Sequence, residues 1–152
     1  MGRITPFLWF DTQAAEAMTF YTGIFPNSRV LGTSAGPDGR VLMATFALDG
    51  QEFMALNGGP HFVFSEAISL FVECADQAEV DYYWERLSEG GEQRDCGWVK
   101  DRFGMSWQIV PRALAEMLAD ADPAQAGRVM AALQQMTKIS VAGLEAAYAQ
   151  AG

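Results

Sequence analysis

Few side chains of this sequence have the type and the setting to do chemistry on a substrate. His61 is the only histidine and follows the Gly58-Gly59-Pro60 turn. A histidine can act as a general base or a metal ligand, but in a Gly/Pro-rich loop it more commonly faces solvent. Cys96 has Arg94 and Lys100 close in sequence and no histidine in a motif with it, which favours a buried inert thiol over a nucleophile. The sequence therefore assigns no catalytic residue.

Two polar residues lie inside apolar segments that are typical of strands. Gln108 lies in the segment from Met105 to Val110, and Glu73 lies in the segment from Leu70 to Cys74. The amide of Gln108 can contact a ligand or hydrogen-bond within its strand, and both interpretations stay open. The carboxylate of Glu73 must be paired or shift its pKa if apolar residues surround it, unless it lies in water at the open end of its strand.

An internal repeat indicates which elements position these residues. The run from Phe7 to Asp11, with the helical pattern after it, is echoed by the run from Leu70 to Cys74, at an offset of 63 residues as from Phe7 to Leu70. A second echo pairs two segments, each a turn glycine followed by a strand, at an offset of 54 residues, as from Gly50 to Gly104. Each copy is too small to bury a sheet face well, so we expect the copies to pack together.

Within each copy the pattern predicts a strand, a helix and three strands. In the first copy, Asp11 and Thr12 are expected to cap the helix, and Asp49-Gly50 to turn a hairpin. In the second copy, Asp76 and Glu79 resemble a capping box. The expected fold class is α+β with paired βαβββ modules and a C-terminal helical extension, in a single domain of residues 1–152. Module 1 covers about 1–60, module 2 about 61–111, and the C-terminal tail 112–152.

The C-terminal tail lies outside the repeat. Asp122-Pro123 predicts a helix start, and Ser140 is expected to cap a final short helix. Val129, Leu133 and Met136 form an apolar helix face that has no partner within its own module. This face favours a twofold homodimer.

Composition and charge exclude several classes of protein. The 19 acidic and 10 basic residues give a net charge of −9, which disfavours nucleic acid as a partner. No apolar run approaches the length of a membrane span, and there is no signal-peptide pattern. Cys74 and Cys96 lack a CxxC spacing and suit free thiols in a reducing compartment. We therefore expect a cytoplasmic location and no membrane partner.

Several segments carry a family likeness. The segments are the opening 4–11, the linker 57–60, the run 96–111 that reads CGWVKDRFGMSWQIVP, and the tail segment beginning Arg128-Val129-Met130. In these segments the chain resembles PhnB-like proteins of the vicinal-oxygen-chelate (glyoxalase/bleomycin-resistance) superfamily, some of which are described as 3-demethylubiquinone 3-methyltransferases. The resemblance implies a glyoxalase/bleomycin-resistance/dioxygenase-like fold with a cup between its sheets. Because the chain shows no Gly-rich turn between a parallel strand and a helix, it offers no cradle for a nucleotide-like cofactor.

Superfamily enzymes hold a metal with one His, Glu or Gln ligand from the first and last strands of each module. Carried over by the repeat, these positions fall on Ile4 (or Pro6), Met54 (or Ala55), Ala67 and Gln108. Only Gln108 can bind a metal, so the metal site is degenerate and no metal or other cofactor is expected.

The leading hypothesis is a PhnB-like protein that binds a small-molecule ligand in an apolar cup without a metal. The alternatives are a metal-dependent lyase, isomerase or dioxygenase that uses Gln108 with His61 or Glu73, a transferase, and a dimeric interaction domain. Strand alternation places the ligand-binding side chains on the cup wall and sends Leu70, Val72, Trp107 and Ile109 to the helix side. The predicted ligand-binding residues are Leu8, Phe10, Met54, Ser69, Phe71, Glu73 and Gln108.

Overall fold

The computed structural model describes residues 4–150, and its backbone packing divides the chain into two compact units, residues 1–64 and 65–152. Each unit contains one four-stranded sheet built in the order strand, helix, three strands. The α+β class and the duplicated βαβββ modules are therefore confirmed. The division falls four residues after the expected end of module 1, and the tail belongs to the second unit.

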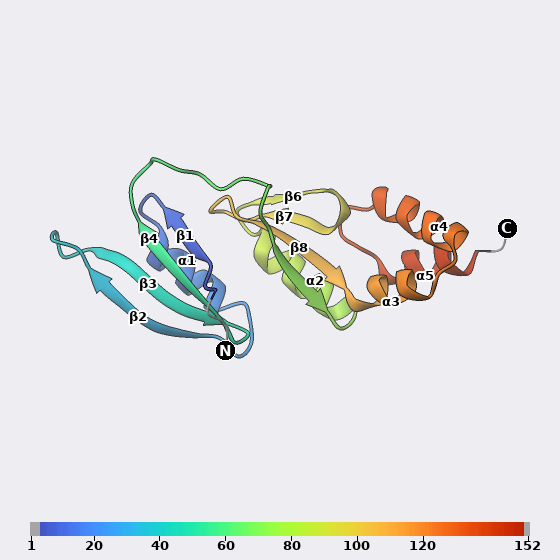
Figure 1. The fold of residues 1–152 in the computed structure, drawn as a ribbon, viewed down its shortest axis with the longest axis horizontal. Helices are drawn as coiled ribbons and strands as arrows, with labels where there is room; N and C mark the ends of the chain where they lie inside the picture. The colour runs from blue at the N-terminus through green and yellow to red at the C-terminus, as the bar shows by residue number, and fades with distance from the viewer. Residues whose placement is uncertain (1–3, 151–152) are drawn as a thin grey trace. The chain divides into compact units, whose positions relative to one another are not determined.

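Unit 1 forms the first sheet, called sheet 1 (Figure 1). Strand β1 lies parallel to β4, whereas β2, β3 and β4 run antiparallel. The hairpin between β3 and β4 turns at Asp49 and Gly50, which both have positive φ as a tight two-residue turn requires. The elements are β1 (Phe7–Phe10), α1 (Ala14–Thr22), β2 (Arg29–Ala35), β3 (Val41–Leu48) and β4 (Gln51–Asn57), with the strands in the order β1-β4-β3-β2.

Helix α1 covers one face of sheet 1, which we call its helix face. Tyr21 of α1 lies 6.3 Å from Phe46 of β3 between ring centroids, and both side chains are fully buried. The prediction that Asp11 and Thr12 cap this helix was wrong, because α1 begins at Ala14. The Asn57 side chain supplies the cap instead, accepting a hydrogen bond from the Ala14 backbone N–H at 2.8 Å. Local sequence did not show this cap because the two residues are 43 positions apart.

Unit 2 forms sheet 2 and carries α2 on its helix face (Figure 1). Asp76 caps α2 by accepting from the Glu79 N–H, and Glu79 in turn accepts from the Ala75 N–H. The Asp76 cap is therefore confirmed. The elements are β5 (Leu70–Cys74), α2 (Gln77–Ser88), β6 (Glu92–Gln93), a 3-10 turn η1 (Asp95–Gly97), β7 (Trp98–Lys100) and β8 (Ser106–Pro111), with the strands in the order β5-β8-β7-β6.

The turn between β7 and β8 is organised by Asp101, which is 3% exposed. Its carboxylate accepts hydrogen bonds from the backbone N–H groups of Phe103 and Met105 and from the indole N–H of Trp107. Three donors compensate the desolvation of this carboxylate. Within the run 96–111, Asp101 and Trp107 therefore stabilise the structure of a turn.

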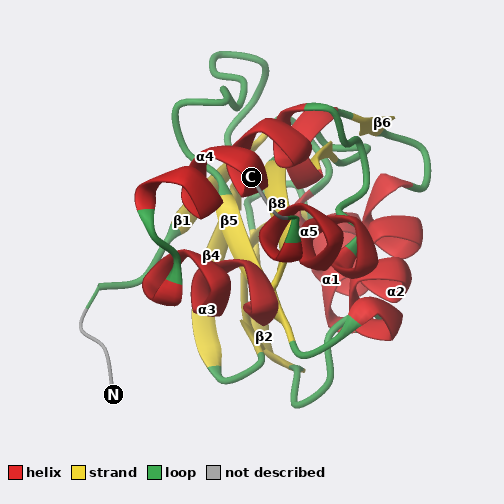
Figure 2. Ribbon diagram, turned by 90° about the vertical axis from the view of Figure 1, so that its right-hand side faces the viewer, coloured by secondary structure: helices red, strands yellow, loops and turns green. Residues whose placement is uncertain are grey.

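The C-terminal tail folds into three helices, α3 (Arg112–Asp120), α4 (Pro123–Gln134) and α5 (Val141–Ala149), drawn in red in Figure 2. The expected caps are confirmed, since Asp122 forms a capping box with Gln125 and Ser140 accepts from the Gly143 N–H. Gln77 of α2 fastens the segment before α5, because its side chain donates to the Ile139 carbonyl and accepts from the Val141 N–H.

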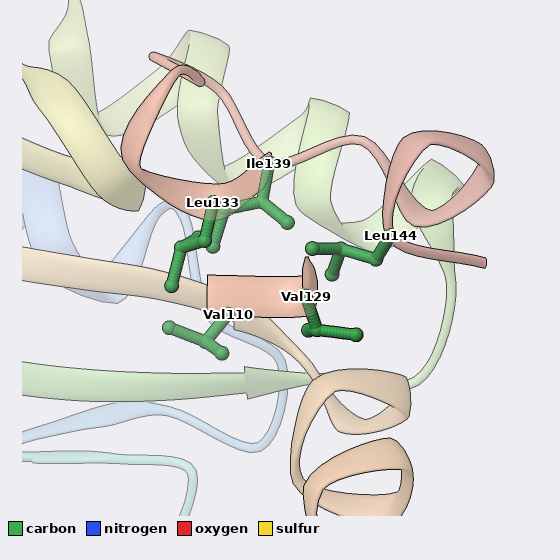
Figure 3. Packing of buried hydrophobic residues seen from close by; sticks show 5 residues of the cluster. All are labelled: Val110, Val129, Leu133, Ile139 and Leu144. Carbon is green, nitrogen blue, oxygen red and sulfur yellow. The ribbon is translucent and has the colours of Figure 1, made fainter. Parts of the chain in front are cut away.

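The apolar face of the tail packs inside unit 2. Val129 and Leu133 of α4 form a buried cluster with Val110 of β8, Ile139 and Leu144, and Leu133 points toward Val110 (Figure 3). The partly buried Met136 packs against it. The premise that this face lacks a partner within its own module was wrong, so it no longer supports a dimer. No helix within residues 4–150 is long and apolar enough to cross a membrane.

Candidate functional site

The candidate site is the open face of sheet 2, which is the face opposite α2. Phe71 on β5 and Trp98 on β7 both lie in register with Gln108 on β8, one from each side. Residues opposite each other across strands project from the same face. Trp107 and Ile109 project from the other face and are buried there at 3% and 0% exposure, as expected. Phe71, by contrast, is 60% exposed.

The Gln108 amide is held in place by Ser69. Its Nε2 donates a hydrogen bond to the Ser69 Oγ at 2.9 Å. One amide N–H, the amide Oε1 and the Ser69 O–H have further hydrogen-bonding capacity. Aromatic rings on both sides and a fixed amide between them give this face apolar contact area together with directional polar groups.

Charged side chains lie at both ends of the group formed by Phe71, Gln108, Ser69 and Trp98. At one end, Arg112 Nε lies 3.0 Å from Glu73 Oε1. At the other end, Glu66 pairs with Arg94 at 3.1 Å and with Lys100 at 3.8 Å, and Arg94 also pairs with Glu92. A hydrogen bond from its own backbone N–H and one from Arg94 lower the pKa of Glu66, which is therefore a carboxylate at neutral pH.

The C-terminal tail limits the open face at the Glu73 end. Strand alternation puts Val110 on the same face as Gln108, but Val110 is buried by the tail cluster. Arg112, the first residue of α3, supplies the partner of Glu73. Glu73 is exposed and ion-paired, which agrees with the expectation that it lies in water at the strand end rather than inside an apolar cup.

The face expected for Leu8 and Phe10 was wrong. Leu8 and Phe10 are 6% and 3% exposed, and Leu8 lies in register with Ala55, which is buried on the helix face. Phe7 projects from the open face and is 50% exposed.

A one-residue difference in the repeat explains this error. Phe7 lies opposite Met54, as Phe71 lies opposite Gln108, so the first strands correspond at an offset of 64, from Phe7 to Phe71. The offset of 63 was wrong by one residue, and a slip of one residue moves every side chain of a strand to the other face.

Met54 lies on the open face of sheet 1, as expected, in register with Phe7 and Thr45. Trp9 projects from the same face, where its indole N–H donates to the Gly59 carbonyl at 2.9 Å. The Phe62 ring packs edge-on against Trp9 at 4.9 Å. The linker after β4 therefore folds back over Trp9.

His61 is exposed to solvent, and Cys96 packs against the C-terminal tail. His61 is exposed and its ring lies 6.4 Å from that of Trp9. Cys96 has a left-handed backbone with φ of 60°, and its N–H donates to the Met136 carbonyl. Its side chain packs against the tail cluster.

The positions that hold metal in the superfamily do not fit a metal ion here. Met54 presents a thioether, Ala55 is buried under α1, and Gln108 offers a single amide oxygen, Oε1. Within residues 4–150 no three His, Cys, Asp or Glu side chains gather closely enough to hold a metal ion. Hard and borderline cations require several such donors.

Two residues of this face, Trp98 and Arg112, were not predicted from the sequence. Trp98 could have been found by counting back from Gln108 across the turn at 101–105, but the length of that turn depends on the Asp101 hydrogen bonds. Arg112 gave no sequence signal, because its contact with Glu73 joins residues 39 positions apart.

Comparisons with known proteins agree with this fold. Residues 2–110 match the family model described as 3-demethylubiquinone-9 3-methyltransferase. A PhnB protein from Bacillus cereus is 34% identical, with a TM-score of 0.67 over 72% of this chain and 99% of that chain. The tail from residue 112 lies beyond the matched family model.

Two more distant structures share the fold. Protein PA1353 from Pseudomonas aeruginosa has a TM-score of 0.61 at 18% identity, over 73% of this chain and 98% of its own. The fosfomycin resistance protein FosX from Listeria monocytogenes, in a structure with Mn(II) and sulfate, has a TM-score of 0.51 at 19% identity, over 70% of this chain and 88% of its own. A comparison with curated protein sequences gave no match.

Proposed function

Because the chain belongs to the family described as 3-demethylubiquinone-9 3-methyltransferase, the PhnB-like branch of the vicinal-oxygen-chelate superfamily, we propose that it binds a small molecule on the open face of sheet 2 without a metal ion. The observation that carries the proposal is the Gln108 amide, held by Ser69 and placed in register with Phe71 and Trp98. Binding on this face buries aromatic surface and uses the amide to orient the ligand.

Methyl transfer, the activity in the family's description, is not part of this proposal. A nucleotide-like methyl donor would need a cradle such as a Gly-rich turn between strand and helix. The corresponding turns here, residues 11–13 after β1 and 75–76 after β5, contain no glycine.

Metal-dependent catalysis, the alternative function, has less support. The Glu73 carboxylate, one potential ligand, is paired with Arg112, and Gln108 Oε1 by itself cannot hold a metal ion. Purified protein should hold well under one equivalent of Zn, Ni, Mn or Fe, and a chelator should leave its melting temperature unchanged. Stoichiometric metal that disappears in Gln108→Ala would support the alternative.

The proposal is tested by protein-observed NMR with a set of small aromatic compounds. Compounds that bind should shift the indole N–H signal of Trp98 and the side-chain amide signals of Gln108. Phe71→Ala should weaken their binding about tenfold, because a large aromatic contact is lost. The matched control is Tyr82→Ala, which removes an exposed ring from α2. Equal affinities for both variants and the unaltered protein would exclude this face as the site.

The homodimer and the cytoplasmic location remain predictions. The homodimer now depends only on the resemblance to the superfamily, since the tail face is buried within unit 2. Sedimentation at micromolar concentration checks this prediction, and a monomer would contradict it.

A further inference from the structure

The charges on the open face of sheet 2 balance one another. Four ion pairs at this face join three carboxylates to three cations. The carboxylates are those of Glu66, Glu73 and Glu92, and the cations are those of Arg94, Lys100 and Arg112. This balance is local, because the whole chain carries a net charge of −9.

The middle of the face is polar but uncharged. Gln108 and Ser69 are the polar groups between the two charged ends, and Phe71 and Trp98 lie on either side of Gln108. A charged ligand group placed here would lose hydration against an amide and two rings, and the charged side chains around it already pair with one another. An uncharged polar group would lose much less.

The hydrogen bond between Gln108 and Ser69 determines what remains to be bound. Because Gln108 Nε2 donates to Ser69 Oγ, the second amide N–H and the Ser69 O–H are available to an acceptor, and the amide Oε1 is available to a donor. An acceptor and a donor side by side on the ligand satisfy these groups together. A carboxylate has no donor, and an ammonium group has no acceptor.

We infer that this face binds a flat, uncharged ligand with an adjacent hydrogen-bond donor and acceptor, as in a primary amide or a lactam. The inference rests on the proposed function and names the class of its ligand. The rings of Phe71 and Trp98 contact the flat part, and the amide of Gln108 pairs with the ligand's donor and acceptor.

Three probes with the same ring test this inference: benzamide, benzoate and benzylamine, the last of which is a cation at pH 7. Binding is followed at pH 7 through the Gln108 side-chain amide and Trp98 indole signals. Benzamide should bind about tenfold more tightly than either charged probe, as expected for two hydrogen bonds gained. This ranking is measured on the unaltered protein and does not depend on any variant folding.

Two variants sharpen the result. Gln108→Leu should remove the preference for benzamide while retaining weak binding of all three probes. Gln108→Glu replaces the amide by a carboxylate of the same shape and should shift the preference to benzylamine.

The outcomes separate the two claims. Tightest binding of benzoate or benzylamine to the unaltered protein, with Trp98 and Gln108 shifted, would overturn the inference and leave the proposed site intact. If none of the probes shifted these signals at millimolar concentration, the proposed site itself would be contradicted.

Discussion

The open faces of the two sheets differ in chemistry although the sheets share strand order and helix placement. Corresponding positions hold Met54 in sheet 1 and Gln108 in sheet 2. Trp9 corresponds in the same way to Glu73, whereas Phe7 and Phe71 are the same residue type. Sheet 1 therefore presents apolar side chains where sheet 2 presents an amide and a carboxylate.

This difference separates the requirements of folding from those of binding. The helix faces of both sheets are apolar, because each must exclude water beneath its helix. The open faces are not held to that requirement and differ in polarity. The directional groups of the candidate site lie on sheet 2, and sheet 1 offers apolar contact area.

The largest expected effect is the difference in stability between a truncation on the helix face of sheet 2 and one on its open face. Trp107→Ala should lower the free energy of unfolding by about 3 to 5 kcal/mol, because the buried indole and its bond to Asp101 are lost. Phe71→Ala should cost less than about 1 kcal/mol, since that ring is mostly exposed. Urea denaturation measures both values. Equal losses would mean that the strands face the other way.

A smaller effect should distinguish the hairpin turns of the two sheets. Asp101→Ala should cost about 2 to 3 kcal/mol, because buried N–H donors lose their acceptor. Asp49→Gly, in the corresponding turn of sheet 1, should change stability by less than about 1 kcal/mol, since glycine accepts the positive φ there. Thermal unfolding of the two variants gives the comparison. A tolerated Asp101→Ala would refute the structural role of this carboxylate.

The smallest expected effect on the structure comes from a labelling experiment that compares the alkylation rates of thiols on the two faces of β5. Burial and the nearby Glu79 carboxylate raise the pKa of the Cys74 thiol to about 12, so it stays protonated and should react very slowly with iodoacetamide at pH 8. In the variant Phe71→Cys, the new thiol on the exposed face should be alkylated much faster. Mass spectrometry resolves the sites, with Cys96 as an internal reference. Rapid labelling of Cys74 in folded protein would place the end of β5 in solvent.

Much of the fold could be predicted from the sequence because its signals are local or repeated. Periodicity and turn residues predicted the two βαβββ modules, and the caps Asp76, Asp122 and Ser140 followed from their own neighbours. The Asn57 cap could not be predicted, because its partner lies in another element.

The candidate site was predicted only in part. Gln108, Ser69, Phe71, Glu73 and Met54 lie on the open faces expected for them, and their role in binding a ligand stays a prediction. Leu8 and Phe10 were assigned to the wrong face, because a repeat in sequence does not determine strand register to one residue.

The sequence by itself determined the elements, their order and the apolar residues that must be buried, since these depend on periodicity and composition. Only the tertiary structure decided the register of β1, the pairing of Glu73 with Arg112 and the packing of the tail on Val110. These features join residues far apart in the chain, and such contacts are selected by the packing of whole elements rather than by local preference.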